Sequence, residues 1–186
     1  MMRTALAHPD RYSRGAIWFH WAIAVLVIVN LIIGLLHDSL LDGVAAALPL
    51  HKSIGLTVLV LTLGRIAWRL GHRPPPLPAT ITPWERFAAN AMHASLYALL
   101  LIMPLTGWML VSGAKTPHPF SWFGLFGVPL LPVSRATGGI AHESHTLLGY
   151  LMALLVLIHI AAALRHHFLL RNSVLARMAP GLAARR

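Results

Sequence analysis

The chain has 186 residues, of which 57% are apolar and 11% are charged, whereas about a quarter of the residues of a soluble domain are charged. This composition excludes an ordinary soluble domain, and the absence of cysteine excludes disulfides, iron–sulfur clusters, thiolate zinc sites and a covalently attached c-type haem. Lysine and arginine total 15 against five acidic residues, but the arginines stand at the ends of apolar segments and form no basic stripe, which excludes a nucleic-acid-binding protein.

Four apolar segments follow one another along the chain, at about residues 16–37, 51–70, 84–112 and 143–168. Each is long enough to cross the roughly 30 Å hydrocarbon core of a bilayer as a helix. The connections between them leave no room for a separate soluble domain. The sequence therefore predicts one domain over residues 1–186, an all-α integral membrane bundle of four helices.

The connection between the third and fourth segments is unusual in its composition. Residues 113–141 contain several aromatic side chains and prolines, which makes this connection too apolar for a solvated loop. We expect it to lie on the membrane surface. Trp122 within it is either an interfacial anchor or a cap over a cofactor at this side of the membrane.

Positive charge is unevenly distributed between the two sides of the membrane. One side holds twelve arginines, which lie before the first segment, around the second connection, and at or after the end of the fourth segment: Arg3, Arg11, Arg14, Arg65, Arg69, Arg73, Arg86, Arg165, Arg171, Arg177, Arg185 and Arg186. The other side holds Lys52, Lys115 and Arg135. By the positive-inside rule, both termini face the cytoplasm.

Twelve histidines are the strongest functional signal, because imidazole within a membrane span is costly and usually has a partner or a role. His145 and His159 lie 14 residues apart in the fourth segment, close to four full helical turns, so both point to the same side of the helix. Their separation along the axis is about 21 Å. The spacing predicts two stacked cofactors, one near each face of the membrane.

Each iron of a bis-histidine haem needs a second imidazole from another helix at the same depth. For the outer level the candidates are His51 and its alternative His37, while His142 competes less well with His145 because it points about 100° away from the direction of His159. For the inner level the candidates are His20 and His93. Spacing does not choose between them.

The histidine pattern favours haem over another metal, since neutral imidazole binds iron, zinc and copper. No intramembrane Asp or Glu accompanies it, which argues against a cation transporter. Small residues within the segments make space either for porphyrin rings or for close helix packing; they are Gly34, Gly55, Gly107 and Gly149.

Several short motifs, in this order and on four spans, resemble the bacterial cytochrome b561 family. They are Trp18-Phe19-His20-Trp21, Leu50-His51-Lys52-Ser53-Ile54-Gly55 with Arg65 and Arg69 downstream, His93-Ala94-Ser95-Leu96-Tyr97, His145-Thr146-Leu147-Leu148-Gly149-Tyr150 through His159 to His166-His167, and Asn172-Ser173-Val174-Leu175-Ala176-Arg177-Met178. The resemblance covers nearly the whole chain.

The resemblance implies a cytochrome of the bacterial inner membrane with two b haems. His20 and His159 would ligate the cytoplasmic-side haem, and His51 and His145 the periplasmic-side haem. His93 is then a cofactor-side or quinone-adjacent residue that does not ligate iron. The family commonly has Glu directly after the outer ligand of the fourth span, where this chain has Thr146, and this departure keeps His142 as a competitor of His145.

The activity that the resemblance implies is a superoxide:ubiquinone oxidoreductase, in which superoxide is oxidised outside and ubiquinone is reduced in the membrane. The alternative is a haem-bearing anchor or electron relay for a separate donor protein, such as a dehydrogenase or hydrogenase. Lys52, Lys115 and Arg135 are the cations that would draw superoxide to the outer face. Arg65, with Arg69 as the second candidate, would pair with a haem propionate, since it lies 14 residues after His51 on nearly the same helix face.

Overall fold

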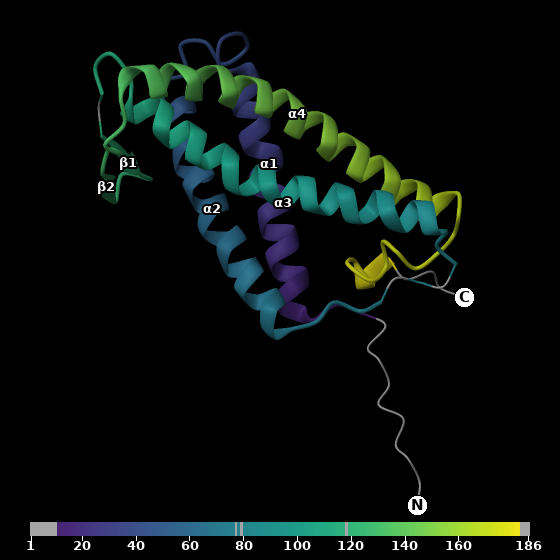
Figure 1. Cartoon of the computed structure of the whole chain (residues 1–186). Coiled ribbons are helices and arrows are strands. Elements are labelled where there is room, and N and C mark those ends of the chain that lie inside the picture. Colours follow the sequence, from purple (N-terminus) through teal and green to yellow (C-terminus); the bar gives the residue numbers. More distant parts are fainter. Residues whose placement is uncertain (1–10, 77, 79, 118, 183–186) are drawn as a thin grey trace, which may run out of the picture.

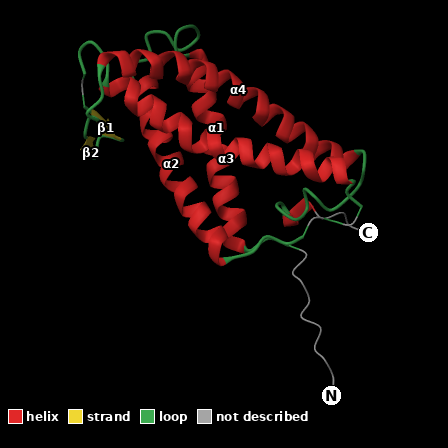
Figure 2. Cartoon of the chain, viewed as in Figure 1, coloured by secondary structure: helices red, strands yellow, loops and turns green. Residues whose placement is uncertain are grey.

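The structure, a computed structural model, describes residues 11–182 except 77, 79 and 118. Within these residues it contains four long helices, α1 (Arg14–Leu36), α2 (Ala47–Gly71), α3 (Pro83–Ser112) and α4 (Arg135–Phe168). It also contains two short strands, β1 (Phe120–Trp122) and β2 (Phe126–Val128), and the 3₁₀ turn η1 (Pro180–Leu182) (Figures 1 and 2). The predicted four-helix membrane bundle is confirmed.

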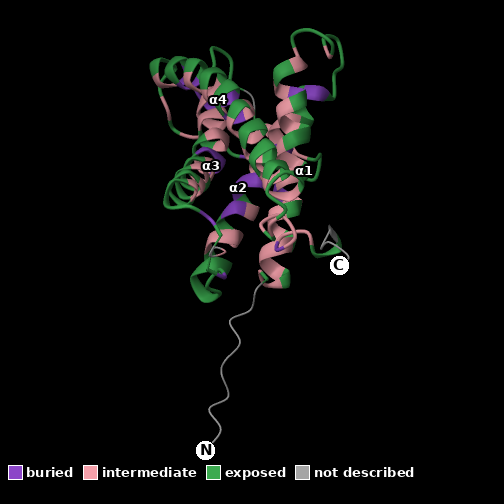
Figure 3. Cartoon of the chain, turned by 90° about the vertical axis from the view of Figure 1, so that its right-hand side faces the viewer, coloured by how far each residue is buried: buried purple, intermediate pink, exposed green. Residues whose placement is uncertain are grey.

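All four helices of the described chain are long and apolar enough to cross a membrane. Their apolar side chains are largely exposed on the outside of the bundle, as at Leu154 and Leu157, which are 54% and 66% exposed (Figure 3). Helices that direct apolar side chains outward on all sides belong in lipid, where every backbone polar group must be satisfied within the helix itself.

The helices form two antiparallel pairs, α1 with α2 and α3 with α4 (Figure 1). The loop between α1 and α2 and the two strands lie at one end of the bundle, which we call the hairpin end. The start of α1, the connection between α2 and α3, and the segment after α4 lie at the other end, which we call the terminal end. This arrangement follows from four consecutive spans joined by short connections.

Side chains fix the starts of three helices. Ser13 caps α1 by accepting a hydrogen bond from the Ala16 N–H at 3.3 Å, and Ser134 caps α4 by accepting one from the Thr137 N–H at 3.1 Å. Such caps satisfy N–H groups that have no partner within the first helical turn. In α3 the Thr82 hydroxyl accepts from the Glu85 N–H while the Glu85 carboxylate accepts from the Thr82 N–H, a capping box.

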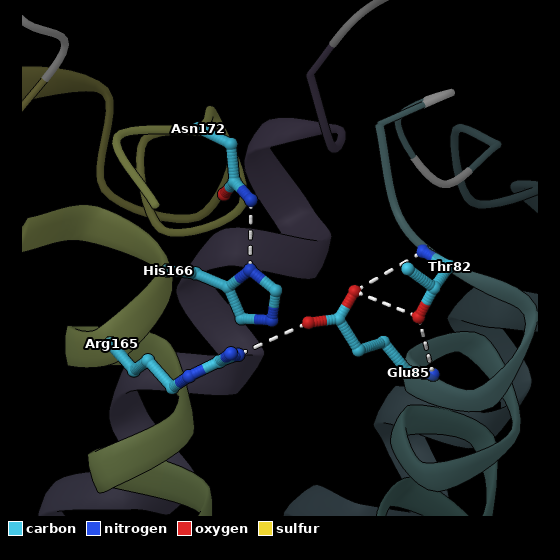
Figure 4. Close-up of polar contacts among 5 residues, drawn as sticks. All are labelled: Thr82, Glu85, Arg165, His166 and Asn172. Carbon is cyan, nitrogen blue, oxygen red and sulfur yellow. Dashed lines mark hydrogen bonds and ion pairs between the residues drawn. The ribbon is translucent and has the colours of Figure 1, made fainter. Parts of the chain in front are cut away.

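The terminal end is held together by polar contacts between α3, α4 and the segment that follows α4 (Figure 4). Arg165 of α4 donates to Glu85 of α3 at 3.1 Å. The Asn172 side chain donates to His166 Nδ1 at 2.8 Å and so folds the chain back after α4. The Trp21 indole N–H donates to the Met178 carbonyl at 2.9 Å, which attaches the same segment to α1.

The connection 113–134 contains a β-hairpin that the sequence did not predict. β1 and β2 pair antiparallel, with Trp122 opposite Phe126. Phe123 and Gly124 at the turn have φ values of 48° and 77°, and the Leu125 N–H bonds to the Trp122 carbonyl at 2.9 Å. Two consecutive residues with positive φ match the right-handed twist of paired strands.

The hairpin lies against α2. The Phe123 N–H donates to the hydroxyl of Ser53 at 3.1 Å, and the Trp122 indole N–H donates to the hydroxyl of Thr57 at 3.1 Å. Ser53 is only 1% exposed. Trp122 therefore attaches the connection to a helix, in addition to any contact that it makes with lipid.

The remaining differences from prediction concern helix ends. α4 begins at Arg135 and not near residue 143, because Ser134 caps it and because Gly138 packs directly on Gly113 at the end of α3. A Cβ on Gly138 would lie 2.7 Å from the Gly113 backbone, so both glycines permit this close approach. α2 likewise begins at Ala47, four residues before the predicted segment.

Candidate functional site

Two pairs of histidine rings lie inside the bundle, one above the other. Toward the hairpin end, the ring centroids of His51 on α2 and His145 on α4 are 6.0 Å apart. Toward the terminal end, those of His20 on α1 and His159 on α4 are 6.2 Å apart. Helix α4 thus supplies one ring to each pair, as the 14-residue spacing predicted.

A backbone carbonyl of α1 orients the His51 ring. His51 Nδ1 lies 3.1 Å from the Asn30 carbonyl oxygen, and since a carbonyl only accepts, Nδ1 carries the proton. One turn further along α1 stands Gly34, where a Cβ would lie 2.8 Å from Cε1 of His51. The absence of a side chain at Gly34 lets the imidazole approach the carbonyl.

The same arrangement recurs at His145. Its Nδ1 lies 3.1 Å from the Met103 carbonyl oxygen and 3.0 Å from the Thr106 hydroxyl. The Thr106 hydroxyl donates its own proton to the Met103 carbonyl, so both oxygens accept from His145. Gly107 stands one turn beyond Met103, and a Cβ there would lie 3.0 Å from Cε1 of His145.

Two of the four glycines singled out in the sequence therefore make room for imidazole rings. The other two face flexible side chains at ordinary contact distances. A Cβ on Gly55 would lie 3.6 Å from the Asn30 amide nitrogen, and one on Gly149 would lie 3.8 Å from the Met103 methyl group.

The geometry of the His51–His145 pair fits an axially ligated haem iron. A protonated Nδ1 leaves the lone pair of a neutral imidazole on Nε2, and such second-shell hydrogen bonds are usual for metal-binding histidines. Two imidazoles that share a metal ion at about 2 Å have ring centroids roughly 6 Å apart. Among the described residues no group of three or more His, Asp or Glu side chains could hold a metal ion. Two imidazoles from different helices are residues that would hold the iron of a b-type haem.

The terminal-end pair has a different polar environment. Arg65 Nη1 lies 3.2 Å from His20 Nδ1, and since a guanidinium only donates, His20 accepts at that nitrogen. Arg65 and Arg69 also lie over the ring of Tyr97 on α3, at 5.3 and 5.8 Å from its centroid. Arg65 is thus at the level of the inner histidines, as the spacing from His51 predicted.

A third ring, that of His93 on α3, joins the terminal-end pair. Its centroid lies 5.5 Å from that of His159, and its Nδ1 donates to the Ala89 carbonyl at 2.7 Å. His159 therefore has a histidine neighbour on α1 and another on α3. The ring centroids of the hairpin-end pair are 6.0 Å apart. The His20–His159 distance of 6.2 Å matches this value more closely than the His93–His159 distance of 5.5 Å does.

The alternative outer histidines occupy other positions. His142 is exposed on α4, one turn before His145. His37 makes local contacts through both ring nitrogens, with Nδ1 donating to the Gly34 carbonyl at 2.8 Å and Nε2 lying 3.1 Å from the Asp38 carboxylate. The ring that faces His51 is that of His145.

The three cations that the sequence analysis assigned to the outer side all lie at the hairpin end. Lys52 follows His51 on α2. Arg135, the first residue of α4, donates to the Lys115 backbone carbonyl at 3.3 Å, which brings these two residues together.

Sequence reasoning missed the groups that orient the rings. The Asn30 and Met103 carbonyls and the Thr106 hydroxyl have no signature in the sequence, because any helical residue offers a carbonyl. The sequence indicates Gly34 and Gly107 only as small residues that make space for porphyrin rings or for close helix packing. The signal that would have indicated these groups is a histidine on one helix together with a glycine at the facing position of the preceding helix.

Comparisons with known proteins identify the family of the chain. Residues 11–181 match the family model described as prokaryotic cytochrome b561. The chain is 35% identical to cytochrome b561 homolog 2 of Escherichia coli over 91% of its length and 92% of that protein, and 32% identical to cytochrome b562 of Cereibacter sphaeroides over 90% and 94%.

A third relative, named probable superoxide oxidase CybB, from Yersinia pestis, is 28% identical over 91% of this chain and 96% of its own length. A family match over most of the chain, four spanning helices and paired intramembrane histidines lead to one conclusion: the chain belongs to the prokaryotic cytochrome b561 family, the multi-pass bacterial membrane proteins that bind b-type haem and transfer electrons.

Proposed function

We propose that this chain oxidises superoxide at its hairpin end and reduces ubiquinone in the membrane, with two b haems per chain. His51 and His145 would hold one haem, and His20 and His159 the other. The observation that carries the proposal is the presence of two imidazole pairs of matching separation, 6.0 and 6.2 Å, about 21 Å apart along α4. The name of the Yersinia pestis relative supports superoxide as the donor.

The haems would supply one-electron redox chemistry when bound, and the protein would contribute ligands, spacing and charge. Two superoxide ions each lose one electron and become dioxygen, while ubiquinone takes two electrons and two protons. The hydrogen bonds from Nδ1 of His51 and His145 to backbone carbonyls keep Nε2 of each ring available to iron.

At the terminal end, Arg65 would have to leave His20 for another acceptor. For Nε2 of a neutral His20 to bind iron, the ring proton must lie on Nδ1, which Arg65 contacts in this structure. A haem propionate is an acceptor of the right charge. We therefore assign the propionate contact to Arg65 in preference to Arg69.

Lys52, Lys115 and Arg135 would raise the local concentration of the superoxide anion. They are the outer cations in the sequence, and a positively charged entrance increases the rate of encounter with an anion. We assign proton delivery for ubiquinone to His93, whose ring lies beside that of His159. Its Nδ1 donates to the Ala89 carbonyl, so Nε2 takes no part in that hydrogen bond.

The orientation belongs to the same proposal. Both termini would face the cytoplasm and the hairpin end would face the periplasm, because twelve of the fifteen basic residues lie at or before the start of α1, around the connection between α2 and α3, or at or after the last turn of α4.

The first experiment is an optical spectrum with haem quantitation on the detergent-purified protein. We expect two b haems per chain. His51→Ala or His145→Ala should remove one and His20→Ala or His159→Ala the other, and His142→Ala serves as the matched control on α4. Loss of haem from His142→Ala with retention in His145→Ala would refute the assignment.

The second experiment adds a superoxide source with and without ubiquinone. Reduction of the haems by superoxide and their reoxidation by ubiquinone would support the full proposal. Two haems that superoxide does not reduce would indicate an electron relay that depends on a separate donor protein. A protein without haem would contradict both functions.

A further inference from the structure

Three arginines stand near the end of α2 that lies at the terminal end of the bundle. Arg65 and Arg69 are one turn apart within the helix and project from nearly the same side of it. Arg73 follows the helix, two residues after its last residue, Gly71. Arg65 is directed to His20 and Tyr97. Arg69 and Arg73 are exposed.

These arginines line a pocket at the terminal end. Its other walls come from Tyr12 and Ser13 at the start of α1, from Trp68 of α2 and from Met178 in the segment after α4. Trp68 is fixed in the wall, since its indole N–H donates to the Ser13 hydroxyl at 3.0 Å and its ring stacks on that of His72 with centroids 4.0 Å apart.

The positive charge of the pocket is not neutralised by its walls. No acidic residue is among the described residues that line it. Glu85, a described carboxylate at this end of the bundle, forms an ion pair with Arg165. Asp38 and Asp42 belong to the loop between α1 and α2, at the hairpin end. The pocket is therefore suited to an anion.

The position and lining of the pocket favour the phosphate of a lipid. Guanidinium groups match phosphate oxygens in geometry as well as charge. The pocket lies where a membrane-spanning helix ends, and Leu70 beside it is 84% exposed and offers an apolar surface for acyl chains. Basic pockets between spanning helices at the cytoplasmic face bind lipid head groups.

We propose that this pocket binds the phosphate group of an anionic phospholipid, with Arg69 and Arg73 as its principal contacts. Arg65, which lines the same pocket, keeps the propionate contact assigned to it above, so the lipid proposal concerns Arg69 and Arg73.

The test uses the purified, haem-containing full-length protein, washed in neutral detergent. Native mass spectrometry counts the molecules of phosphatidylglycerol or phosphatidylcholine that remain bound as each lipid is titrated. We expect one tightly bound phosphatidylglycerol per chain and no comparable phosphatidylcholine. Arg69→Gln with Arg73→Gln should weaken phosphatidylglycerol binding roughly thirtyfold, the attraction of about two surface arginines.

The matched control is Arg86→Gln with Arg171→Gln, which removes the same charge from exposed positions outside the pocket. This pair should bind the lipid as the wild type does, and equal losses in both pairs would overturn the proposal. Arg73→Gln alone provides a milder change, and haem content measured on the same samples shows that each variant is folded.

Inorganic phosphate provides the competing source of the same chemistry. If it binds without lipid and displaces phosphatidylglycerol at similar concentrations, the pocket is a site for a soluble phosphate and the lipid proposal is wrong. If phosphatidylglycerol stays bound in excess phosphate, the proposal is supported.

Discussion

Gly34 and Gly107 occupy equivalent places on two different helices. Each follows by four residues the residue whose carbonyl accepts a hydrogen bond from a histidine, Asn30 in α1 and Met103 in α3. Each lies where a Cβ would meet that imidazole at 2.8 or 3.0 Å, closer than normal van der Waals contact. Each ring of the hairpin-end pair therefore lies in the same way against the helix that precedes its own, His51 against α1 and His145 against α3.

Replacing either glycine by alanine should displace one ring of this pair. We expect Gly34→Ala and Gly107→Ala each to lower the haem content from two to about one per chain. Helix propensity alone would make these variants more stable, since alanine favours a helix over glycine by about 1 kcal/mol. Haem quantitation and the optical spectrum of the remaining haem measure the effect. Gly55→Ala and Gly149→Ala, whose Cβ atoms have ordinary contact distances, should keep both haems, and a similar loss in these controls would contradict the steric explanation.

Arg65 should affect the redox potential of the terminal-end haem. Arg65→Gln removes a positive charge beside His20, and a nearby positive charge favours the reduced iron. We expect the potential of that haem to fall by on the order of 50–100 mV, with the other haem almost unchanged. A redox titration followed optically measures both. Arg73→Gln, beyond the end of α2, is the control and should shift the potential less.

The positions of two rings on α4 could be predicted from the sequence, because helical periodicity fixes both the direction and the spacing of His145 and His159. Spacing could not identify the rings that face them, since the relative rotation of neighbouring helices is set by packing, and those partners were implied only by the family resemblance. The close approach of His93 to His159 at 5.5 Å is an example, because two histidines on separate helices have no periodic relationship.

Among the elements, the β-hairpin is held to α2 by two hydroxyls, those of Ser53 and Thr57, and Ser53 is the more deeply buried of the two. Ser53 accepts from the Phe123 N–H and donates to the Pro49 carbonyl at 2.9 Å. Ser53→Ala would leave that N–H without a partner, at a cost of about 1–3 kcal/mol.

We expect proteases to cleave the connection 113–134 several times faster in Ser53→Ala than in the wild type, with haem content unchanged. The rate of limited proteolysis in reconstituted vesicles measures this. Ser95→Ala, at an exposed serine of α3, is the control. Equal cleavage rates in the two variants would show that Ser53 does not hold the hairpin.

The hairpin and the start of α4 were the elements that sequence reasoning missed. Each strand has only three residues, too few for an alternating pattern, and its aromatic side chains also suit a membrane surface. The first turns of α4 contain Arg135, Gly138 and Gly139, so hydropathy rises only after the helix has begun. Caps and backbone contacts mark that start better than composition does.

At the scale of the whole molecule, the two ends of the bundle should face opposite compartments. The chain has no cysteine, so single introduced cysteines report position without background. We expect a membrane-impermeant maleimide to label Ser39→Cys in intact cells and Ser173→Cys only after the inner membrane is opened. Both positions are exposed, and labelling in the reverse pattern would invert the proposed orientation.

The division of histidines among the helices bears on how the protein is made. In both proposed haem sites one ligand comes from the α1–α2 pair and the other from α4, the last helix to be synthesised. Neither site is complete on a nascent chain that ends before residue 145, and the terminal-end site is incomplete until residue 159 has been added. Haem binding must then follow synthesis of α4, and each bound haem connects the late half of the protein to the early half. In a cell short of haem, inserted chains would accumulate in which no haem connects the α1–α2 pair to α4. Those chains would be the ones exposed to membrane quality-control proteases.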